Sequence, residues 1–217
     1  MATAYAHAAP RALVKIAIVG HVDHGKSTLV GRLLNDTDSL PAGKVDAVAE
    51  MCKRRGMPFE WAFVTDALRA ERDQGITIDA SHIRFSDTVR DYVLIDAPGH
   101  REFLKNMISG AAGCDAALVV IDADEGVREQ SRRHGYLLHL LGVRQIAVAV
   151  TKMDTVDFDA ARFGRIESDF RRLLEELGIE LSAIVPVSGR DGDNIATRSA
   201  KTPWYHGPTV LEAAAAF

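Results

Sequence analysis

The sequence predicts an α/β fold: a doubly wound, mostly parallel sheet of six strands with helices on both faces. Apolar runs alternate with amphipathic stretches along the whole chain, which is the pattern of strand–helix–strand units. The run from Ala116 to Ile121 is apolar without interruption, as expected of a central strand covered on both faces. The 217 residues, of which 47% are hydrophobic and 26% charged, suffice for one domain with a sizeable core.

The individual elements follow from hydrophobic periodicity. Each short apolar run indicates a strand, and each stretch with apolar residues three or four apart indicates a helix. We expect strands at residues 14–19, 76–85, 91–95, 116–121, 145–150 and 182–187, with a turn at Ser86-Asp87. We expect helices at residues 28–34, 43–55, 64–73, 102–112, 128–141, 159–177 and 210–216.

One connection is unusually long. The polar segment from Asn35 to Gln74 contains two of the expected helices, separated by Gly56-Met57-Pro58. A link between a helix and the next strand needs far fewer residues, and long insertions of this kind often carry function.

The charge balance narrows the range of partners. A formal net charge of −4 offers no general attraction to nucleic acid or to an anionic membrane, so we do not expect direct nucleic-acid binding. Arg128, Arg132 and Arg133 could form a local basic patch, but a solvated helix face is the simpler interpretation. No apolar run reaches membrane-spanning length.

The ends of the chain and its cysteines add little chemistry. Residues 1–13 are expected to be a disordered leader, and residues 14–217 a single nucleotide-binding domain. Cys52 and Cys114 lie far apart and have no partners at metal-ligand spacing, and we expect Cys114 to be buried. The composition is that of a reduced, cytoplasmic protein.

A glycine-rich turn between the first strand and the first helix carries the strongest signal. Gly20-His21-Val22-Asp23-His24-Gly25-Lys26-Ser27 matches G-x-x-x-x-G-K-[ST], a phosphate loop in a P-loop NTPase fold. Successive backbone N–H groups and the helix N-terminus favour phosphate there. Lys26 would reach the β- and γ-phosphates, and the Ser27 hydroxyl would bind Mg²⁺. The residues expected to contact the phosphates are His21, Val22, Asp23, His24, Gly25, Lys26, Ser27 and Thr28. A glycine turn that matches by chance is disfavoured, because an expected strand precedes this segment and an expected helix follows it.

Two further clusters lie where a γ-phosphate would need them. In Asp96-Ala97-Pro98-Gly99-His100, Asp96 would hold the Mg²⁺ shell, the Gly99 N–H would approach the terminal phosphate, and His100 would orient water. In the alternative, purely structural interpretation, Asp96 is a helix cap and His100 is a surface residue. Thr77 would reach Mg²⁺ from a mobile loop, although a lone threonine entering a strand is normally structural. The predicted metal ligands are Ser27, Thr77 and Asp96, and the predicted catalytic residues are His100, Lys26 and Thr77.

The last two strands end in residues suited to a guanine base. In Thr151-Lys152-Met153-Asp154, the Asp154 carboxylate can accept hydrogen bonds from guanine N1–H and from the 2-amino group. Adenine has no such pair of donors, so Asp154 would select GTP and GDP. Lys152 would lie along the base, and backbone N–H groups of Ser188-Gly189-Arg190 would meet guanine O6. Taken singly, each segment could be an ordinary turn.

Other chemistries lack the residues they need. We find no Ser/His/Asp triad, no metal-binding His/Cys cluster and no paired carboxylates. His134 and His139 are five residues apart on an expected helix, which does not place them on one face, so we interpret both as structural.

These motifs resemble those of the translation-factor superfamily of GTPases. Residues 20–27, 75–79 and 96–100 look like its phosphate loop, switch I and switch II. The resemblance implies that His100 positions the attacking water and that Ser27 and Thr77 bind Mg²⁺. It also leaves room for a monovalent cation beside Asp23. The superfamily continues into two β-barrel domains, and we expect this sequence to hold the GTPase domain without them.

Within the superfamily, three stretches are most similar to the GTPase subunit of bacterial ATP sulfurylase, the large subunit of sulfate adenylyltransferase. They are residues 66–79, residues 121–134, and residues 192–195 with 203–212. This resemblance implies GTP hydrolysis coupled to sulfate activation by a partner, the small adenylyltransferase subunit. Thr151 replaces the usual Asn of the guanine motif. We therefore expect a weaker tie between residues 151–154, which we call the base loop, and the phosphate loop.

Two alternatives stay open. His21, His24 and Ala97 favour an elongation-factor-type GTPase that acts with tRNA and the ribosome. A module that binds nucleotide without turnover is the third interpretation, and Lys26, Thr77 and His100 argue against it.

Overall fold

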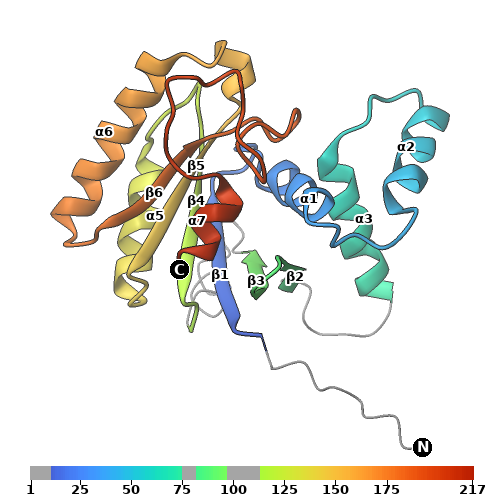
Figure 1. Ribbon diagram of the computed structural model, residues 1–217, viewed down its shortest axis with the longest axis horizontal. Helices are drawn as coiled ribbons and strands as arrows, with labels where there is room; N and C mark the ends of the chain where they lie inside the picture. Colours follow the sequence, from blue (N-terminus) through green and yellow to red (C-terminus); the bar gives the residue numbers. More distant parts are fainter. Residues whose placement is uncertain (1–10, 75–81, 97–112) are drawn as a thin grey trace, which may run out of the picture.

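The computed structural model describes residues 11–74, 82–96 and 113–217. Its helices and strands are β1 (Leu13–Gly20), α1 (Lys26–Asp36), α2 (Lys44–Arg54), α3 (Trp61–Gln74), β2 (His82–Ser86), β3 (Asp91–Asp96), β4 (Ala116–Asp122), α5 (Glu129–Leu140), β5 (Gln145–Thr151), the 3₁₀ helix η2 (Met153–Val156), α6 (Ala160–Glu176), β6 (Leu181–Pro186) and α7 (Val210–Ala215). Figure 1 shows the strands side by side in one sheet, with α5 and α6 on one face and α1 and α7 on the other.

The sheet has the strand order β2-β3-β1-β4-β5-β6. β1 pairs in parallel with both β3 and β4, and β4, β5 and β6 continue the parallel arrangement. Only β2 runs antiparallel, paired with β3 through the turn after Ser86. Because consecutive strands diverge to either side of β1, the carboxyl end of β1 lies at a topological switch point, where ligands bind in such sheets. The predicted fold class is confirmed.

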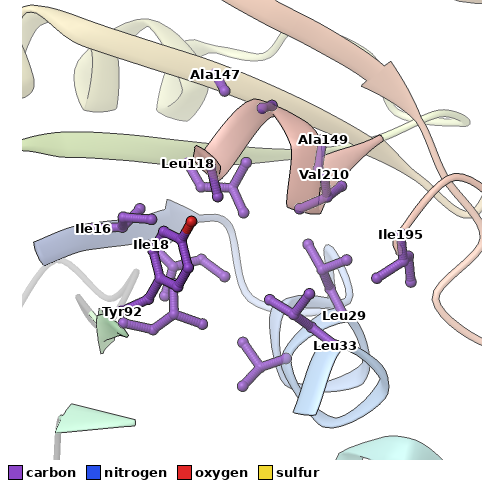
Figure 2. Close-up of a cluster of buried hydrophobic side chains, with 14 of the residues drawn as sticks. Ile16, Ile18, Leu29, Leu33, Tyr92, Leu118, Ala147, Ala149, Ile195 and Val210 are labelled. Atoms are coloured by element: carbon purple, nitrogen blue, oxygen red, sulfur yellow. The ribbon is translucent and has the colours of Figure 1, made fainter. Parts of the chain in front are cut away.

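Alternation along β1 divides the core into two layers. Ile16 and Ile18 face the layer formed with α1 and α7, while Ala17 and Val19 face the layer formed with α5 and α6. Figure 2 shows Ile16 and Ile18 with Leu29 and Leu33 of α1 and Val210 of α7, in the first layer. Both faces of the central strands are therefore buried under helices, which accounts for their uninterrupted apolar sequence.

The long insertion folds as a helical pair against α1. α2 and α3 enclose a small core of their own around Val48, Cys52 and Val64. In Figure 1 they lie beside α1, away from the centre of the sheet. α1 and α3 approach closely at Gly31, where a Cβ atom would stand 2.3 Å from the carbonyl oxygen of Trp61. Only glycine permits this approach, so the insertion is fixed directly to the helix that follows the phosphate loop.

Most expected boundaries agree with the structure to within two residues, with two exceptions. α3 begins at Trp61, three residues before the expected start, because Trp61 already packs against α1. Leu13 belongs to β1 and not to a leader, since it pairs in register with Asp91. The expected helix at 102–112, residues 1–10 of the expected leader and the first part of the expected strand at 76–85 lie outside the described residues.

None of the described helices combines the length and apolar character that crossing a membrane requires.

Candidate functional site

The phosphate loop connects β1 to α1 by a left-handed turn at the helix cap. Gly25 has φ +82°, a conformation that favours glycine, and it stands at the N-cap of α1. Among the described residues, no side chain caps this helix end. The amide groups of the first turn therefore point out of the helix toward the loop, as anion binding requires. Val22 and Asp23 are exposed at the loop apex.

Lys26 reaches back over the loop. Its Nζ donates to the carbonyl oxygen of Gly20 at 2.8 Å and to that of His21 at 2.7 Å. Two of the three ammonium donors are thereby directed by the main chain. The amine is held over the carboxyl end of β1, where a phosphate bound by the amides of α1 would also lie.

His24 anchors the loop from beneath. Its ring is 1% exposed, and Nδ1 lies 3.2 Å from the carbonyl oxygen of Val120 at the end of β4. A carbonyl oxygen can only accept, so Nδ1 carries the hydrogen. Nε2 faces the Glu125 carboxylate at 3.4 Å. The structure thus gives His24 a supporting role under the loop, while His21 is half-buried beside it with ring centroids 5.3 Å apart.

Thr151 ties the base loop to the phosphate loop. The side chain is buried, and its hydroxyl Oγ1 lies 2.6 Å from the carbonyl oxygen of His24 and 3.1 Å from that of Ile121. The hydroxyl has one hydrogen, which it donates to one of these two oxygens at a time. We expected a weaker tie where Thr151 replaces the usual Asn; the threonine hydroxyl itself contacts the phosphate loop at the His24 carbonyl oxygen.

Lys152 and Asp122 form an ion pair that sequence reasoning missed. The Nζ of Lys152 lies 2.7 Å from Oδ2 of Asp122, whose side chain is 5% exposed. Burial alone would raise the pKa of Asp122, but the hydrogen bonds from Lys152 and from the Asp124 amide lower it overall. Asp122 is the last residue of β4 and directly follows the expected strand at 116–121, so the same search for polar residues after strand ends could have found it. The pair fixes Lys152 beside the base loop.

Asp154 and Arg190 meet across the base loops. Asp154 lies in η2 with its side chain 13% exposed, and its Oδ2 is 3.4 Å from Nη2 of Arg190. Ser188 is buried, and Gly189 packs against Thr28 of α1, where a Cβ atom would stand 3.1 Å from Cγ2 of Thr28. The structure therefore brings the expected base-reading residues to the same edge as the phosphate loop.

A network of side chains rigidifies the segment after Arg190. Asn194 is 1% exposed, and its Nδ2 donates to the carbonyl oxygen of Pro186 at 2.8 Å and to Oγ1 of Thr202 at 2.9 Å. Its Oδ1 accepts from the amide of Ser199 at 2.8 Å. Asn194 has φ +57°, a region that asparagine tolerates better than most residues. Every polar group of this buried side chain is used to hold the loop.

The expected Mg²⁺ ligands are only partly described. Ser27 lies in the first turn of α1, and its carbonyl oxygen accepts a hydrogen bond from the buried Thr65 hydroxyl of α3 at 2.9 Å. Asp96 ends β3 opposite Ile18 in register, but only its main chain is described. Thr77, Gly99 and His100 lie outside the described residues. Within the described residues, no group of three or more His, Cys, Asp or Glu side chains could hold a metal ion. The serine hydroxyl and the aspartate carboxylate are nevertheless the residue types that supply the hard oxygen ligands that Mg²⁺ prefers.

His134 is buried on α5 and is uncharged at neutral pH. Burial first, then the positive charge of Lys26 and the electrostatic influence of the nearby His24 and His21, lower its pKa to about 4. His139 is half-exposed on the same helix and contacts Arg144. Both positions agree with the structural interpretation.

Cys114 is only half-buried, contrary to the expected full burial, because it lies before β4 and not within it.

Comparisons with known proteins agree on one family. The model described as "Elongation factor Tu GTP binding domain" matches residues 11–216. Elongation factor 1-alpha of Thermococcus kodakarensis is 46% identical over 200 residues, which cover 92% of this chain and 46% of that protein. The chain therefore spans about half the length of the curated relatives it matches.

Solved structures show the same fold. Sup35 complexed with GDP aligns with a TM-score of 0.63 and 25% identity, over 93% of this chain and 44% of that one. The Ski7 GTPase-like domain of S. cerevisiae, bound to GDP and inorganic phosphate, aligns with a TM-score of 0.74 at 20% identity, over 94% and 48% of the two chains. The relatives named here support the elongation-factor alternative better than the expected ATP sulfurylase subunit.

Proposed function

Because the chain belongs to the elongation factor Tu GTP-binding domain family, we propose that it binds Mg²⁺ and GTP, hydrolyses GTP to GDP, and serves as the nucleotide switch of a translation-type factor. The observation that carries this proposal is the meeting of two recognition elements at one sheet edge. Lys26 lies over the carboxyl end of β1, and Asp154 lies in η2, directly after β5. Thr151, at the end of β5, bonds to the phosphate loop and so joins the two segments. One loop suits the phosphates, and the other suits guanine.

The roles follow from the chemistry of each group. The α1 amides and Lys26 would bind the phosphates, and Asp154 would accept from guanine N1–H and the 2-amino group. Mg²⁺, held by Ser27, Thr77 and Asp96, would neutralise charge on the β- and γ-phosphates. His100 would orient the attacking water. GTPase chemistry of this kind depends mostly on positioning and electrostatic stabilisation.

Base recognition is tested by Asp154→Asn. The asparagine amide presents one donor and one acceptor, which suits the O2 and N1–H of xanthine and opposes the 2-amino group of guanine. Equilibrium binding of GDP should weaken by about 100-fold or more, and binding of xanthosine diphosphate should improve, since a base partner left unpaired costs about 10⁴–10⁵ in selective sites. Unchanged preference for GDP in the variant would refute the assignment of the base site.

Catalysis is tested by His100→Ala. The variant should bind GTP as the parent does and hydrolyse it more slowly, because positioned proton-transfer and water-orienting groups contribute about 10²–10⁴-fold. Single-turnover hydrolysis separates this effect from binding. Equal turnover in the two proteins would remove His100 from the catalytic residues.

The translation-type role is tested by adding ribosomes and aminoacyl-tRNA. The names of the relatives support it, and ribosome-stimulated hydrolysis by the chain, alone or within its longer protein, is the expected result. The net charge of −4 predicts that any RNA contact is local and confined to small basic patches.

Coupling to sulfate activation is the second candidate. It is supported by the three stretches at residues 66–79, 121–134 and 203–212 with 192–195, which resemble the GTPase subunit of ATP sulfurylase. Its partner would be the small adenylyltransferase subunit. If GTP fails to stimulate adenylyl-sulfate formation when that subunit is added, this candidate is excluded.

A further inference from the structure

The guanidinium of Arg190 lies on the carboxylate expected to read guanine. Nη2 of Arg190 is 3.4 Å from Oδ2 of Asp154, and the two side chains are 74% and 13% exposed. Arg190 is thus the cation that covers a largely buried carboxylate from the solvent side. A carboxylate in such a position is where an incoming base must make its contacts.

Guanine and Arg190 require the same acceptor. Each of the two Asp154 oxygens is needed by one N–H group of the base, because N1–H and the 2-amino group lie side by side. A guanidinium presents the same pattern of two adjacent N–H groups to a carboxylate. Each carboxylate oxygen can accept two hydrogen bonds, but a guanidinium lying against Oδ2 weakens that oxygen as an acceptor and covers the carboxylate from the solvent side. The base therefore makes its best pair of hydrogen bonds when Arg190 withdraws from Oδ2.

The main chain of Arg190 is fixed, so its side chain alone must move. The carbonyl oxygen of Arg190 accepts from Nη1 of Arg32 at 3.3 Å and from Nε1 of Trp61 at 3.3 Å. Arg32 in turn pairs with Asp36 at 2.8 Å, and its guanidinium lies over the Trp61 ring. These contacts from α1 and α3 hold Arg190 at the mouth of the base site.

Arg190 has a second acidic partner, Asp191, which still pairs with the guanidinium when it leaves Asp154. Nε of Arg190 donates to Oδ1 of Asp191 at 3.1 Å, and Lys201 lies 2.9 Å from Oδ2 of the same residue. The hydrogen bonds from Lys201 and then Arg190 lower the pKa of Asp191, which therefore stays ionised. Displacement from Asp154 thus leaves no charge unpaired, and the exchange costs little.

We propose that the Arg190 side chain competes with the guanine base for Asp154 and thereby lowers the affinity of the site for both GTP and GDP. The inference rests on the proposed function, since it requires that Asp154 reads guanine. It makes Arg190 a determinant of nucleotide affinity through its side chain, beyond the backbone contact expected from the sequence.

The test is Arg190→Ala with fluorescent GDP and GTP analogues. Removing the positive charge of Arg190 near the nucleotide phosphates would ordinarily weaken nucleotide binding. Competition for Asp154 predicts tighter binding instead. Because an exposed ion pair contributes little, we expect dissociation constants about two- to five-fold lower for both nucleotides, through faster association. Dissociation constants that stay the same or rise would overturn the proposal.

Two comparisons isolate the pair. Arg190→Ala in an Asp154→Asn background should not tighten binding of xanthosine diphosphate, because no carboxylate is left to contest; equal tightening there would overturn the proposal. Arg172→Ala removes a matched cation, paired with Asp169 at 2.7 Å on α6, and should leave both affinities unchanged. If Arg172→Ala tightens binding as much, general charge and not Arg190 is responsible.

The outcomes also separate this inference from the proposed function. If the parent chain binds neither GDP nor GTP, the proposed function fails. If the parent binds both and Arg190→Ala does not tighten binding, only the inference about Arg190 fails.

Discussion

The phosphate loop and the base loop meet at one edge of the sheet, but they are built from different parts of the chain. The phosphate loop is shaped by main chain: a left-handed Gly25, helix amides and a lysine that bonds to backbone carbonyls. The base loop (residues 151–154), together with the loop after β6 that completes the base site, is shaped by side chains: the buried amide of Asn194, and the ion pairs of Arg190 and Lys201 with acidic neighbours.

This difference predicts which measurement each loop controls. A main-chain loop keeps its conformation when an outward-pointing side chain is removed, so changes there should affect binding more than folding. A loop held by buried side-chain bonds loses its conformation when one is removed, because a buried polar group left unpaired costs about 1–3 kcal/mol. Changes there should affect folding as well as binding.

Lys26→Ala should produce the largest effect on binding. The phosphates lose their main counter-charge, so GDP and GTP binding should fall below detection, by at least about 100-fold, or about 3 kcal/mol. The free energy of unfolding should change by less than about 1 kcal/mol, because Lys26 is only half-buried and water can replace its ammonium at the loop carbonyls. Calorimetric titration and urea unfolding check both. Retained affinity would refute the phosphate loop, and a large loss of stability would refute the contrast between the loops.

Asn194→Ala should reverse that pattern. The variant loses two donated bonds and one accepted bond in a buried position, and it places alanine at φ +57°. We expect the free energy of unfolding to fall by about 2–4 kcal/mol, with weaker guanine binding as a consequence. Ser182→Ala, at an exposed position of β6, is the control for urea unfolding. A loss below about 1 kcal/mol would show that the network does not support the loop.

The same contrast explains what could be predicted from the sequence. The phosphate loop, and strands such as β4, are each encoded by contiguous residues, so motif spacing and apolar runs were enough. The bonds from Arg32 and Trp61 to Arg190 join residues 158 and 129 positions apart. No local pattern marks such contacts, because only the folded topology brings the residues together. Asp122 is different: its position at the end of β4 could be predicted from the sequence, but its pairing with Lys152 could not.

His134 is buried on α5 and feels the charges of the phosphate loop, and its shifted pKa predicts a pH effect. Its pKa falls from 6.5 to about 4 on folding, so between these values the unfolded chain binds the extra proton. Stability therefore falls as pH drops from 7 toward 4, by about 2 kcal/mol between pH 7 and pH 5 for this residue. Urea unfolding at the two pH values measures it. His134→Leu should reduce the difference, whereas His139→Gln, at a half-exposed position, should leave it unchanged. An undiminished pH difference in His134→Leu would exclude His134 as its source.

Thr151 joins the two loops and provides the finest test of the contrast. Thr151→Val keeps the shape of the side chain and removes the hydroxyl that bonds to the His24 carbonyl at 2.6 Å. One buried hydrogen bond contributes about 1 kcal/mol, so the free energy of unfolding should fall by about that amount. If the tie transmits order from the base loop to the phosphate loop, affinity for inorganic pyrophosphate, which has no base, should also fall about two- to five-fold. Thr151→Asn restores a donor and should recover both values. Loss of stability with unchanged pyrophosphate affinity would show that the phosphate loop, being shaped by its own main chain, needs no support from the base loop.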